Sequence, residues 1–214
     1  VIDAPPREGV PGVVLVVTDG RPTTGMRDGR MIINGVTADN GLRNSIYAFG
    51  GGRTVNRYLL DLLAYRNKGE SRVAGTLEDI DEMLPEFFSR LDEPLLVDIE
   101  TDYGRIDESE VFPRVAPDFY RGQAVTVYGR FAPGADQDFT MRLTGRAREK
   151  EKELIFRANL DAARTGNTEI ARNWAFQKVY HLIGEISRHG ETPELLNQLR
   201  QLSARYGIRT SYDE

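Results

Sequence analysis

The fold of this chain is decided by the stretch Val13-Val14-Leu15-Val16-Val17-Thr18-Asp19-Gly20. Its apolar part, residues 13–17, is bounded by Pro11-Gly12 before it and by the Thr-Asp-Gly turn after it. A short, continuous apolar run between turn residues is typical of a strand buried in a parallel sheet. Parallel sheets bind ligands at the carboxyl ends of their strands. Asp19 therefore stands where a ligand-binding group is expected.

Strand and helix patterns alternate around this stretch, through residues 1–91. Further strands are predicted over residues 45–49 and, at a sheet edge, over residues 72–74. A short helix is predicted over residues 27–34, and two longer ones are expected to begin after Thr54 and Thr76 as capping residues. Their inward residues are predicted to be Val55, Leu59, Leu62 and Leu63 in the first, and Ile80, Leu84, Phe87 and Phe88 in the second, which spans residues 77–91. This alternation predicts an α/β fold with a parallel sheet and helices on its faces.

The pattern changes at Asp92-Glu93-Pro94, because proline does not extend the preceding helix and period-two alternation follows it. We therefore predict a second domain, an antiparallel β-sandwich over residues 92–160. Its strands are expected at residues 96–101, 124–131, 138–145 and, more weakly, 152–158. Its core is predicted to contain Leu96, Ile99, Val125, Val127, Phe131, Phe139, Met141 and Leu143.

Helical spacing returns in residues 161–214, which we expect to pack on the sandwich as a helical segment. One helix is expected over residues 168–187 and another after Thr192-Pro193, a cap followed by proline at the first helical position. Trp174, the single tryptophan, is predicted to be buried in an apolar seam with Ile170, Val179 and Ile183.

Composition narrows the classes of function. Hydrophobic residues make up 40% and charged residues 29% of the 214 residues, which is typical of a folded globular protein. A net charge of -5 disfavours a nucleic-acid partner. The longest strongly apolar run, residues 13–17, falls far short of the roughly 20 residues that span a bilayer, so no membrane-spanning segment is predicted. The chain contains no cysteine and begins at Val1 without a leader pattern, so we expect it to be part of a longer protein.

Asp19 admits three interpretations. It can serve only the turn, which its spacing favours, or it can help to hold a divalent cation through its carboxylate oxygens. It can also be the nucleophile of a hydrolase of the haloacid dehalogenase type, but the second aspartate that such enzymes place two residues from the first is absent.

Other candidate motifs have simple structural explanations. Gly50-Gly51-Gly52 lacks the third glycine of a dinucleotide-binding turn, so a tight strand-to-helix turn is expected. The basic residues Arg146, Arg148, Lys150 and Lys152 alternate with Glu149, Glu151 and Glu153, so their charges are expected to cancel largely, on a solvated hairpin or helix end. His181 and His189 lack the spacing of a helical zinc pair and are expected to be structural or surface residues. No catalytic constellation is predicted.

Several motifs in collinear order resemble the inter-alpha-trypsin inhibitor heavy chains and their von Willebrand factor A domain. The motifs are Thr18-Asp19-Gly20-Arg21-Pro22-Thr23, Ser45-Ile46-Tyr47-Ala48-Phe49-Gly50, Glu93-Pro94-Leu95-Leu96, Phe119-Tyr120-Arg121-Gly122, Trp174-Ala175 and Leu202-Ser203-Ala204-Arg205-Tyr206. Bacterial proteins that join a vault-inter-alpha-trypsin domain to an A domain match as well as the animal proteins do. The resemblance implies that residues 1–91 are the C-terminal half of an A domain, a partial doubly wound fold.

The same resemblance implies a metal-ion-dependent adhesion site. In the family this site combines Asp-x-Ser-x-Ser, a threonine of a middle loop and the aspartate of Thr-Asp-Gly, of which this sequence contains only the last, Asp19. Mg²⁺ or another divalent cation is therefore expected only where the upstream half of the site is present. The Asp-Pro-His that forms an ester to glycosaminoglycan in the animal heavy chains has no counterpart at Tyr212-Asp213-Glu214.

The expected function is that of a non-enzymatic binding or adhesion protein, secreted, periplasmic or on the cell surface. Its partner would be a protein or an extracellular matrix ligand that presents an acidic group to the cation. A metal-free structural scaffold and the hydrolase with Asp19 as nucleophile remain the alternatives.

Overall fold

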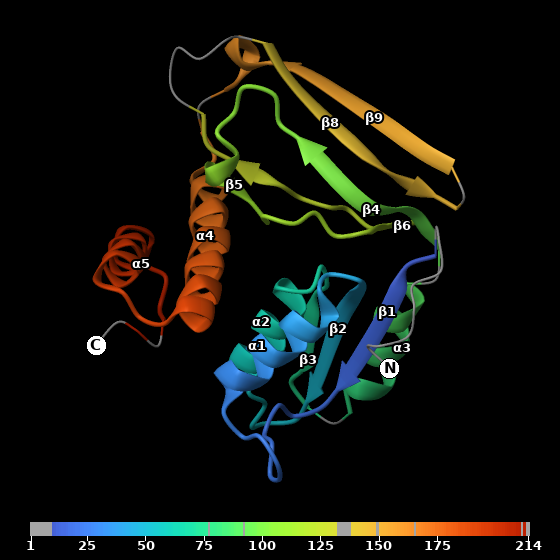
Figure 1. Cartoon of the computed structure of the whole chain (residues 1–214), viewed down its shortest axis with the longest axis vertical. Helices are drawn as coiled ribbons and strands as arrows, with labels where there is room; N and C mark the ends of the chain where they lie inside the picture. Colours follow the sequence, from blue (N-terminus) through green and yellow to red (C-terminus); the bar gives the residue numbers. More distant parts are fainter. Residues whose placement is uncertain are drawn as a thin grey trace. The chain divides into compact units, whose positions relative to one another are not determined.

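The computed structural model describes residues 10–76, 78–91, 93–131, 138–148, 150–164, 166–210 and 212 (Figure 1). The chain divides into two compact units, and each unit is assembled from separate segments. The first unit comprises Val1–Ile99, Pro117–Val125 and Gly145–Lys152, and the second comprises Glu100–Ala116, Thr126–Thr144 and Glu153–Glu214. The domain boundary near Pro94, including Asp92 outside the described residues, stays a prediction.

The first unit contains the parallel sheet. Its strands are β1 (Gly12–Val17), β2 (Asn44–Gly51) and β3 (Ser71–Ala74), in the order β1-β2-β3. Both pairs are parallel, with Val13 opposite Ser45 and Ala48 opposite Ser71. The predicted α/β fold is thus confirmed, but β1 is not the buried strand that its sequence indicated. Among the described strands it hydrogen-bonds only to β2, and Val17 is 58% exposed.

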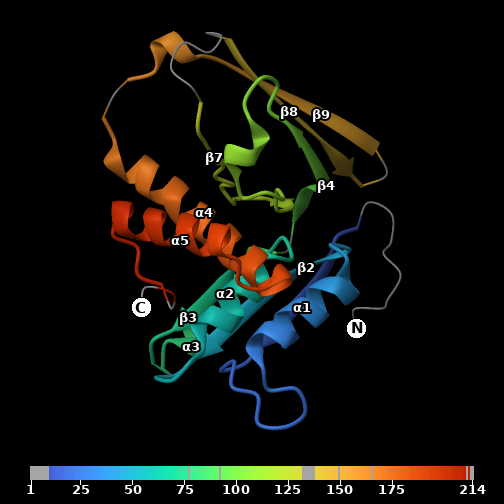
Figure 2. The same cartoon turned by 60° about the vertical axis from the view of Figure 1, so that its left-hand side comes forward.

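Helices cover both faces of this sheet because side chains alternate along β2. Ala48 packs with Leu60 and other residues of α2 (Arg57–Tyr65), and with Ile32 of α1 (Gly29–Asn40). The next side chain, Phe49, points to the opposite face and packs with Phe87 of α3 (Ile80–Ser89). Figure 2 shows α1 and α2 side by side. Tyr47 and Phe49 therefore build one half of the core and Ala48 the other.

The ends of these helices correct several predictions. Helix α1 continues to Asn40, beyond the expected end at residue 34, and stops where Gly41 adopts φ 52°. Asn56, rather than Thr54, caps α2, because its side chain accepts a hydrogen bond from the Leu59 N–H at 3.2 Å. Asparagine caps a helix as well as threonine does, so composition alone did not decide between them.

Helix α3 begins later than expected, at Ile80. Thr76 and Asp79 exchange hydrogen bonds ahead of it, with the Thr76 N–H donating to Asp79 Oδ2 at 2.9 Å. Leu77, the predicted first residue, lies outside the described residues. Phe87 is buried as predicted, but Phe88 is 61% exposed. A helix with one partner sheet buries one stripe, and Phe88 lies beside that stripe rather than in it.

A charge cluster in the first unit consists of the buried residues Ser45, Lys68 and Asp118 and the exposed residue Asp98. The Asp118 carboxylate is 2% exposed and accepts hydrogen bonds from Ser45 Oγ at 2.8 Å and from the Asp98 N–H at 3.0 Å. Lys68 Nζ lies 3.7 Å from Asp118 and 3.9 Å from Asp98. The cluster ties the start of β2 to the segment Pro117–Val125, so this segment belongs to the same unit as the parallel sheet.

The predicted antiparallel sheets are present. Strands β4 (Pro94–Asp102), β6 (Phe119–Tyr120), β8 (Asp138–Ala147) and β9 (Lys150–Asn159) form one sheet in the order β6-β4-β8-β9, and β5 (Val111–Phe112) pairs with β7 (Tyr128–Gly129). The β4–β6 and β5–β7 pairs are antiparallel. The strand predicted over residues 124–131 is wrong in extent, because only Tyr128–Gly129 is paired. Short 3-10 turns occur at Glu108–Glu110 and Leu160–Ala162.

The predicted sandwich core is confirmed only in part. Leu96 and Leu143 are 3% exposed, whereas Phe131 is 47% exposed. The remaining predicted residues are half-buried: Ile99, Val125, Val127, Phe139 and Met141. Strand β9 is exposed along its whole length. A period-two pattern marks which residues share a face, but it does not show whether a second layer covers that face.

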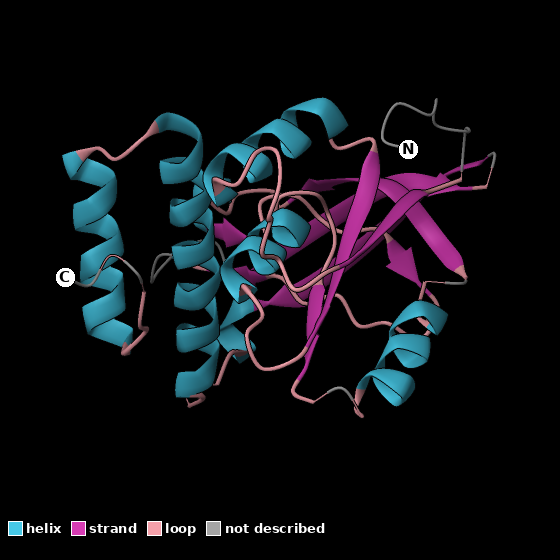
Figure 3. Cartoon of the chain, turned by 90° about the horizontal axis from the view of Figure 1, so that it is seen from below, coloured by secondary structure: helices cyan, strands magenta, loops and turns pink. Residues whose placement is uncertain are grey.

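The second unit contains the two C-terminal helices, α4 (Thr168–His189) and α5 (Pro193–Tyr206), which pack against each other (Figure 3). Thr192 caps α5 and Pro193 occupies its first turn, both as predicted. Gly207 ends it with φ 62°. None of the helices among the described residues is long and apolar enough to cross a membrane.

Trp174 of α4 is buried, as predicted, and is 3% exposed. Its Nε1–H donates a hydrogen bond to the Glu110 carbonyl at 2.8 Å, and its ring lies edge-on to Phe112, 6.2 Å between centroids. Two cations lie over the indole: Arg130 at 4.7 Å and Lys178 at 5.1 Å from its centroid. The surroundings are therefore more polar than the predicted apolar seam. Ile170, a predicted member of that seam, is 58% exposed.

His181 gives the second unit a pH dependence. Burial lowers the pKa of this imidazole below its ordinary value of 6.5, and Arg114, Lys178 and Arg188 oppose its protonation while Glu185 favours it. The folded protein thus binds the proton less well than the unfolded chain. The contribution of the neutral His181 to the free energy of unfolding is therefore expected to be complete above pH 6.5 and to decrease as the pH falls toward the lower pKa of the folded state. We expect His181→Gln to reduce the change in the urea unfolding midpoint between pH 7 and pH 5. If the midpoint of the variant changes with pH as much as that of the wild type, His181 is not the source of the pH dependence.

Candidate functional site

Asp19 lies at the carboxyl end of β1, at the edge of the parallel sheet where its position in the sequence predicted it. The ladder extends one residue past the strand, because the Thr18 N–H donates to the Phe49 carbonyl at 3.0 Å. The Asp19 side chain is exposed. The strand therefore delivers this carboxylate to solvent beside the turn that leads from β2 to α2.

The loop after β1 is fixed against the start of α2. The Asn56 N–H donates to the Asp19 carbonyl at 2.8 Å. Gly20 follows with φ 70°, and a Cβ on it would lie 3.0 Å from the Asn56 carbonyl oxygen. Glycine is required there for both its conformation and its lack of a side chain. Sequence reasoning missed Asn56, although asparagine before an amphipathic helix is a known capping signal.

One oxygen of the Asp19 carboxylate takes part in a local turn. Its Oδ1 accepts a hydrogen bond from the Arg21 N–H at 2.9 Å. Carboxylates that bind cations keep such backbone contacts as orienting interactions, and carboxylates that only stabilise a turn make the same contact. This geometry is compatible with both interpretations of Asp19.

Asp19 offers one carboxylate as a potential cation ligand. Within the part of the chain that the structure describes, no group of three or more His, Asp or Glu side chains could hold a metal ion. Hard cations take six or more oxygen ligands, and several of these come from the protein. The described residues therefore do not form a complete cation site around Asp19. The assignment of a metal to Asp19 stays a prediction.

The glycine turn after β2 is explained by packing. A Cβ on Gly50 would lie 2.7 Å from Leu60 Cδ1 and 3.2 Å from the Thr18 carbonyl oxygen, and one on Gly51 would collide with Ile80. Gly52 adopts φ 109°. These glycines bring α2 and α3 close to the sheet, as expected of a strand-to-helix turn.

The histidines lie in the second unit. The His181 ring contacts Phe112, with 5.4 Å between the ring centroids. His189 Nε2 lies 3.5 Å from a carboxylate oxygen of Glu185, which is partly exposed. Each has a structural neighbour of its own on or next to α4. Neither histidine belongs to a group of three or more potential metal ligands among the described residues.

Residues 146–153 lie where β8 leads into β9, so the predicted solvated hairpin is present, but its basic residues are gathered on one side. Arg146, Arg148, Lys150 and Lys152 all line one pocket of the first unit, and the described glutamates between and after them, Glu151 and Glu153, are not among its lining residues. Glu153 instead pairs with Arg142 at 3.0 Å, and Glu149 lies outside the described residues. Alternation along a strand sends successive side chains to opposite faces, so charges that cancel in the sequence are separated in space.

Comparison with known proteins places the chain beside the heavy chains that its motifs resemble. No protein-family model matches it. Human inter-alpha-trypsin inhibitor heavy chain H1 is 24% identical over 213 residues, which cover 92% of this chain and 23% of the relative. Heavy chain H3 of Mesocricetus auratus is 27% identical over 209 residues, covering 92% and 24%. The similarity to this family is confirmed, and the chain spans about a quarter of the length of these curated relatives.

Two solved structures also resemble the chain. They are the ArnB paralog VWA2 from Sulfolobus acidocaldarius, with a TM-score of 0.45 and 15% identity over 95% of this chain and 57% of that one, and a von Willebrand factor type A protein from Catenulispora acidiphila, with a TM-score of 0.46 and 12% identity over 97% and 57%.

Proposed function

We propose that this chain is part of a non-enzymatic binding or adhesion protein whose A-type domain recognises a partner through a divalent cation. The observation that carries the proposal is the exposed Asp19 carboxylate at the carboxyl end of β1, held by the contact between the Asp19 carbonyl and Asn56. The similarity to inter-alpha-trypsin inhibitor heavy chains over 92% of the chain supports it.

In this proposal Asp19 is one ligand of Mg²⁺ or a similar ion. The remaining protein oxygens come from an Asp-x-Ser-x-Ser loop and a threonine, which the full A domain must provide beside Asp19. The cation supplies a coordination position that a partner carboxylate fills. The partner is then a protein or extracellular matrix ligand with an acidic group, and the protein acts outside the cytoplasm, secreted or at a cell surface.

A metal-free scaffold is the second candidate. It requires no metal, since the hydrogen bond from the Arg21 N–H to Asp19 Oδ1 is a structural role that this carboxylate fills by itself. The hydrolase alternative requires Asp19 to act as a nucleophile. It has less support, because the sequence lacks the second aspartate that such a hydrolase places two residues from its nucleophile to act as acid and base.

The test is calorimetric titration of Mg²⁺ and Mn²⁺ into the full-length protein that contains this chain. Asp19→Ala is expected to weaken cation binding by about tenfold or more, since loss of a single group at a metal site costs on this scale. Asp81→Ala, which removes an exposed carboxylate from the first turn of α3, is the matched control and should leave binding unchanged.

The outcomes separate the three candidates. Cation binding that depends on Asp19 supports adhesion through a metal. The absence of any binding heat in the wild-type protein, with an intact fold, supports the scaffold. Trapping of a phosphorylated Asp19 after incubation with acetyl phosphate would support the hydrolase and overturn the proposal.

A further inference from the structure

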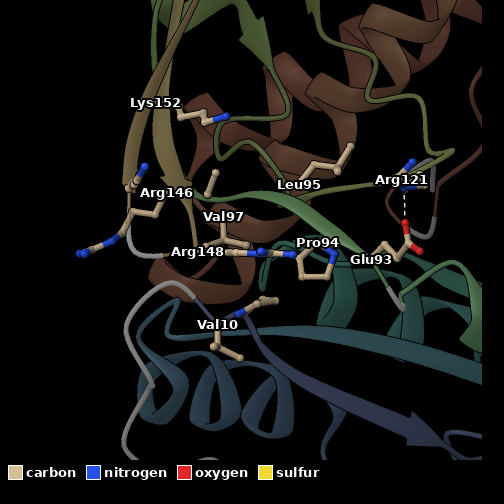
Figure 4. Close-up of a pocket in the computed structure, with 12 residues that line it drawn as sticks. Val10, Glu93, Pro94, Leu95, Val97, Arg121, Arg146, Arg148 and Lys152 are labelled. Atoms are coloured by element: carbon tan, nitrogen blue, oxygen red, sulfur yellow. Dashed lines mark ion pairs between the residues drawn. The ribbon is translucent and has the colours of Figure 1, made fainter.

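A pocket of about 1010 Å³ in the first unit combines a basic wall with an apolar one. Arg146, Arg148, Lys150 and Lys152 come from the connected ends of β8 and β9, and Leu95 and Val97 come from β4. Figure 4 shows the labelled members of this set, Arg146, Arg148, Lys152, Leu95 and Val97, around the same space. The pocket is separate from the Asp19 loop, which does not contribute to its lining.

The charge of this pocket is not neutralised by its own lining. Among the described residues that line the pocket, Glu93 is the single acidic one, and it forms an ion pair with Arg121, drawn as a dashed line in Figure 4. Arg148, Lys150 and Lys152 are exposed, so their charged ends remain hydrated and available to an incoming anion. An excess of positive charge therefore faces the pocket of a chain whose net charge is -5.

The apolar wall limits what the anion can be. Val97 is 2% exposed and Leu95 is 49% exposed, so Leu95 presents apolar surface to a ligand. The lining includes no aromatic side chain on which a base could stack. A ligand that satisfies both walls carries carboxylates and aliphatic groups together, as a peptide of acidic and aliphatic residues does.

The spacing of the cations favours an extended peptide. Lys150 and Lys152 are two residues apart in β9, and side chains at that separation on a strand lie about 7 Å apart on one face. Carboxylates at alternate residues of an extended peptide have the same spacing. We propose that this pocket binds an acidic, extended peptide segment of a partner protein, with glutamate or aspartate at alternate positions and aliphatic residues between them.

This binding goes beyond the proposed function, because it uses protein cations instead of a bound metal. It should therefore persist in EDTA, whereas recognition through Asp19 should not. It should also weaken steeply as salt rises, since the charges involved are exposed and screened within about 10 Å at 0.1 M ionic strength. The EDTA and salt measurements can therefore contradict the peptide proposal without contradicting the cation proposal, and the reverse.

The test uses the full chain and a fluorescein-labelled peptide, Glu-Leu-Glu-Val-Glu-Leu-Glu, followed by fluorescence anisotropy in low salt with EDTA. The double charge reversal Arg148→Glu/Lys150→Glu is expected to raise the dissociation constant by about tenfold or more, as reversal turns attraction into repulsion. The matched control, Arg164→Glu/Arg172→Glu, changes the net charge equally at exposed residues next to and within α4. It should leave binding within about twofold of wild type.

A second comparison tests the apolar wall. Replacing leucine and valine of the peptide with serine should weaken binding several-fold, and Arg148→Lys/Lys150→Arg should preserve it, which shows that the charge matters and that the fold tolerates change there. Three results would overturn the proposal: equal loss in the control variant, equal binding of the serine peptide, or tighter binding of inorganic polyphosphate or a sulfated polysaccharide than of the peptide. Far-UV circular dichroism of each variant excludes unfolding as the cause.

Discussion

Replacing Trp174 with alanine is expected to lower the free energy of unfolding of the second unit by about 3 to 5 kcal/mol, the range for removing a buried aromatic side chain. The residue is 3% exposed and packs edge-on against Phe112. The change also leaves the Glu110 carbonyl without the indole donor that lies 2.8 Å away. A cavity and a lost hydrogen bond act in the same direction, so the effect should be at the upper end of single substitutions.

Urea unfolding followed by far-UV circular dichroism measures this effect, because the variant lacks the only tryptophan and has no indole fluorescence. Phe176→Ala is the control. Phe176 lies on the same helix but is 44% exposed and contacts Tyr180, so its loss should cost much less. Equal destabilisation by the two variants would show that the indole is not the anchor of α4.

In the wild-type protein, Trp174 fluorescence gives an independent measurement. A buried indole emits at shorter wavelength and is poorly quenched by iodide. The cations Arg130 and Lys178 over the ring attract iodide, so quenching is a severe test of burial. Red-shifted emission with strong quenching in the folded protein would contradict the packing of α4 described above.

Elements with strong local signals could be predicted from the sequence. The apolar runs of β1 and β2 and the spacing of α4 and α5 each reflect a pattern within one segment. The ends of elements were harder to predict. Thr54 and Asn56 are both good capping residues, and which of them caps α2 depends on where the turn after β2 ends. The exposure of Phe88 could not be predicted either. A periodic pattern indicates which face of a helix is buried, but tertiary packing determines how wide the buried stripe is.

Contacts between distant segments could not be predicted. Asp118 meets Ser45 across 73 residues of sequence, and neither residue type announces burial. The basic pocket has a different cause. The net charge of residues 146–153 does not show that alternate side chains point to opposite faces, and the side chains of Arg146, Arg148, Lys150 and Lys152 line one pocket. The position of Asp19 at a strand end could be predicted from the apolar run before it, whereas its role as a metal ligand stays a prediction.

The second large effect is expected at the charge cluster. Asp118→Ala should lower the free energy of unfolding of the first unit by about 3 to 5 kcal/mol, because it leaves a buried cation without its nearest counter-ion. Lys68 is 7% exposed and lies 3.7 Å from Asp118, and its other partner, Asp98, is 61% exposed. The substitution also removes the acceptor of the Ser45 hydroxyl and of the Asp98 N–H.

Three further variants, measured by urea unfolding, decide whether charge burial is the cause: Asp98→Asn, Lys68→Met and the double variant Lys68→Met/Asp118→Ala. Asp98→Asn retains a residue that tolerates the observed φ of 52° and removes only an exposed charge, so it should cost about 1 kcal/mol or less. Lys68→Met combined with Asp118→Ala removes both buried charges and should recover part of the loss, because the unpaired cation is then gone. If the double variant is as unstable as the two single changes added together, the stability comes from the hydrogen bonds to Asp118 and not from its pairing with Lys68.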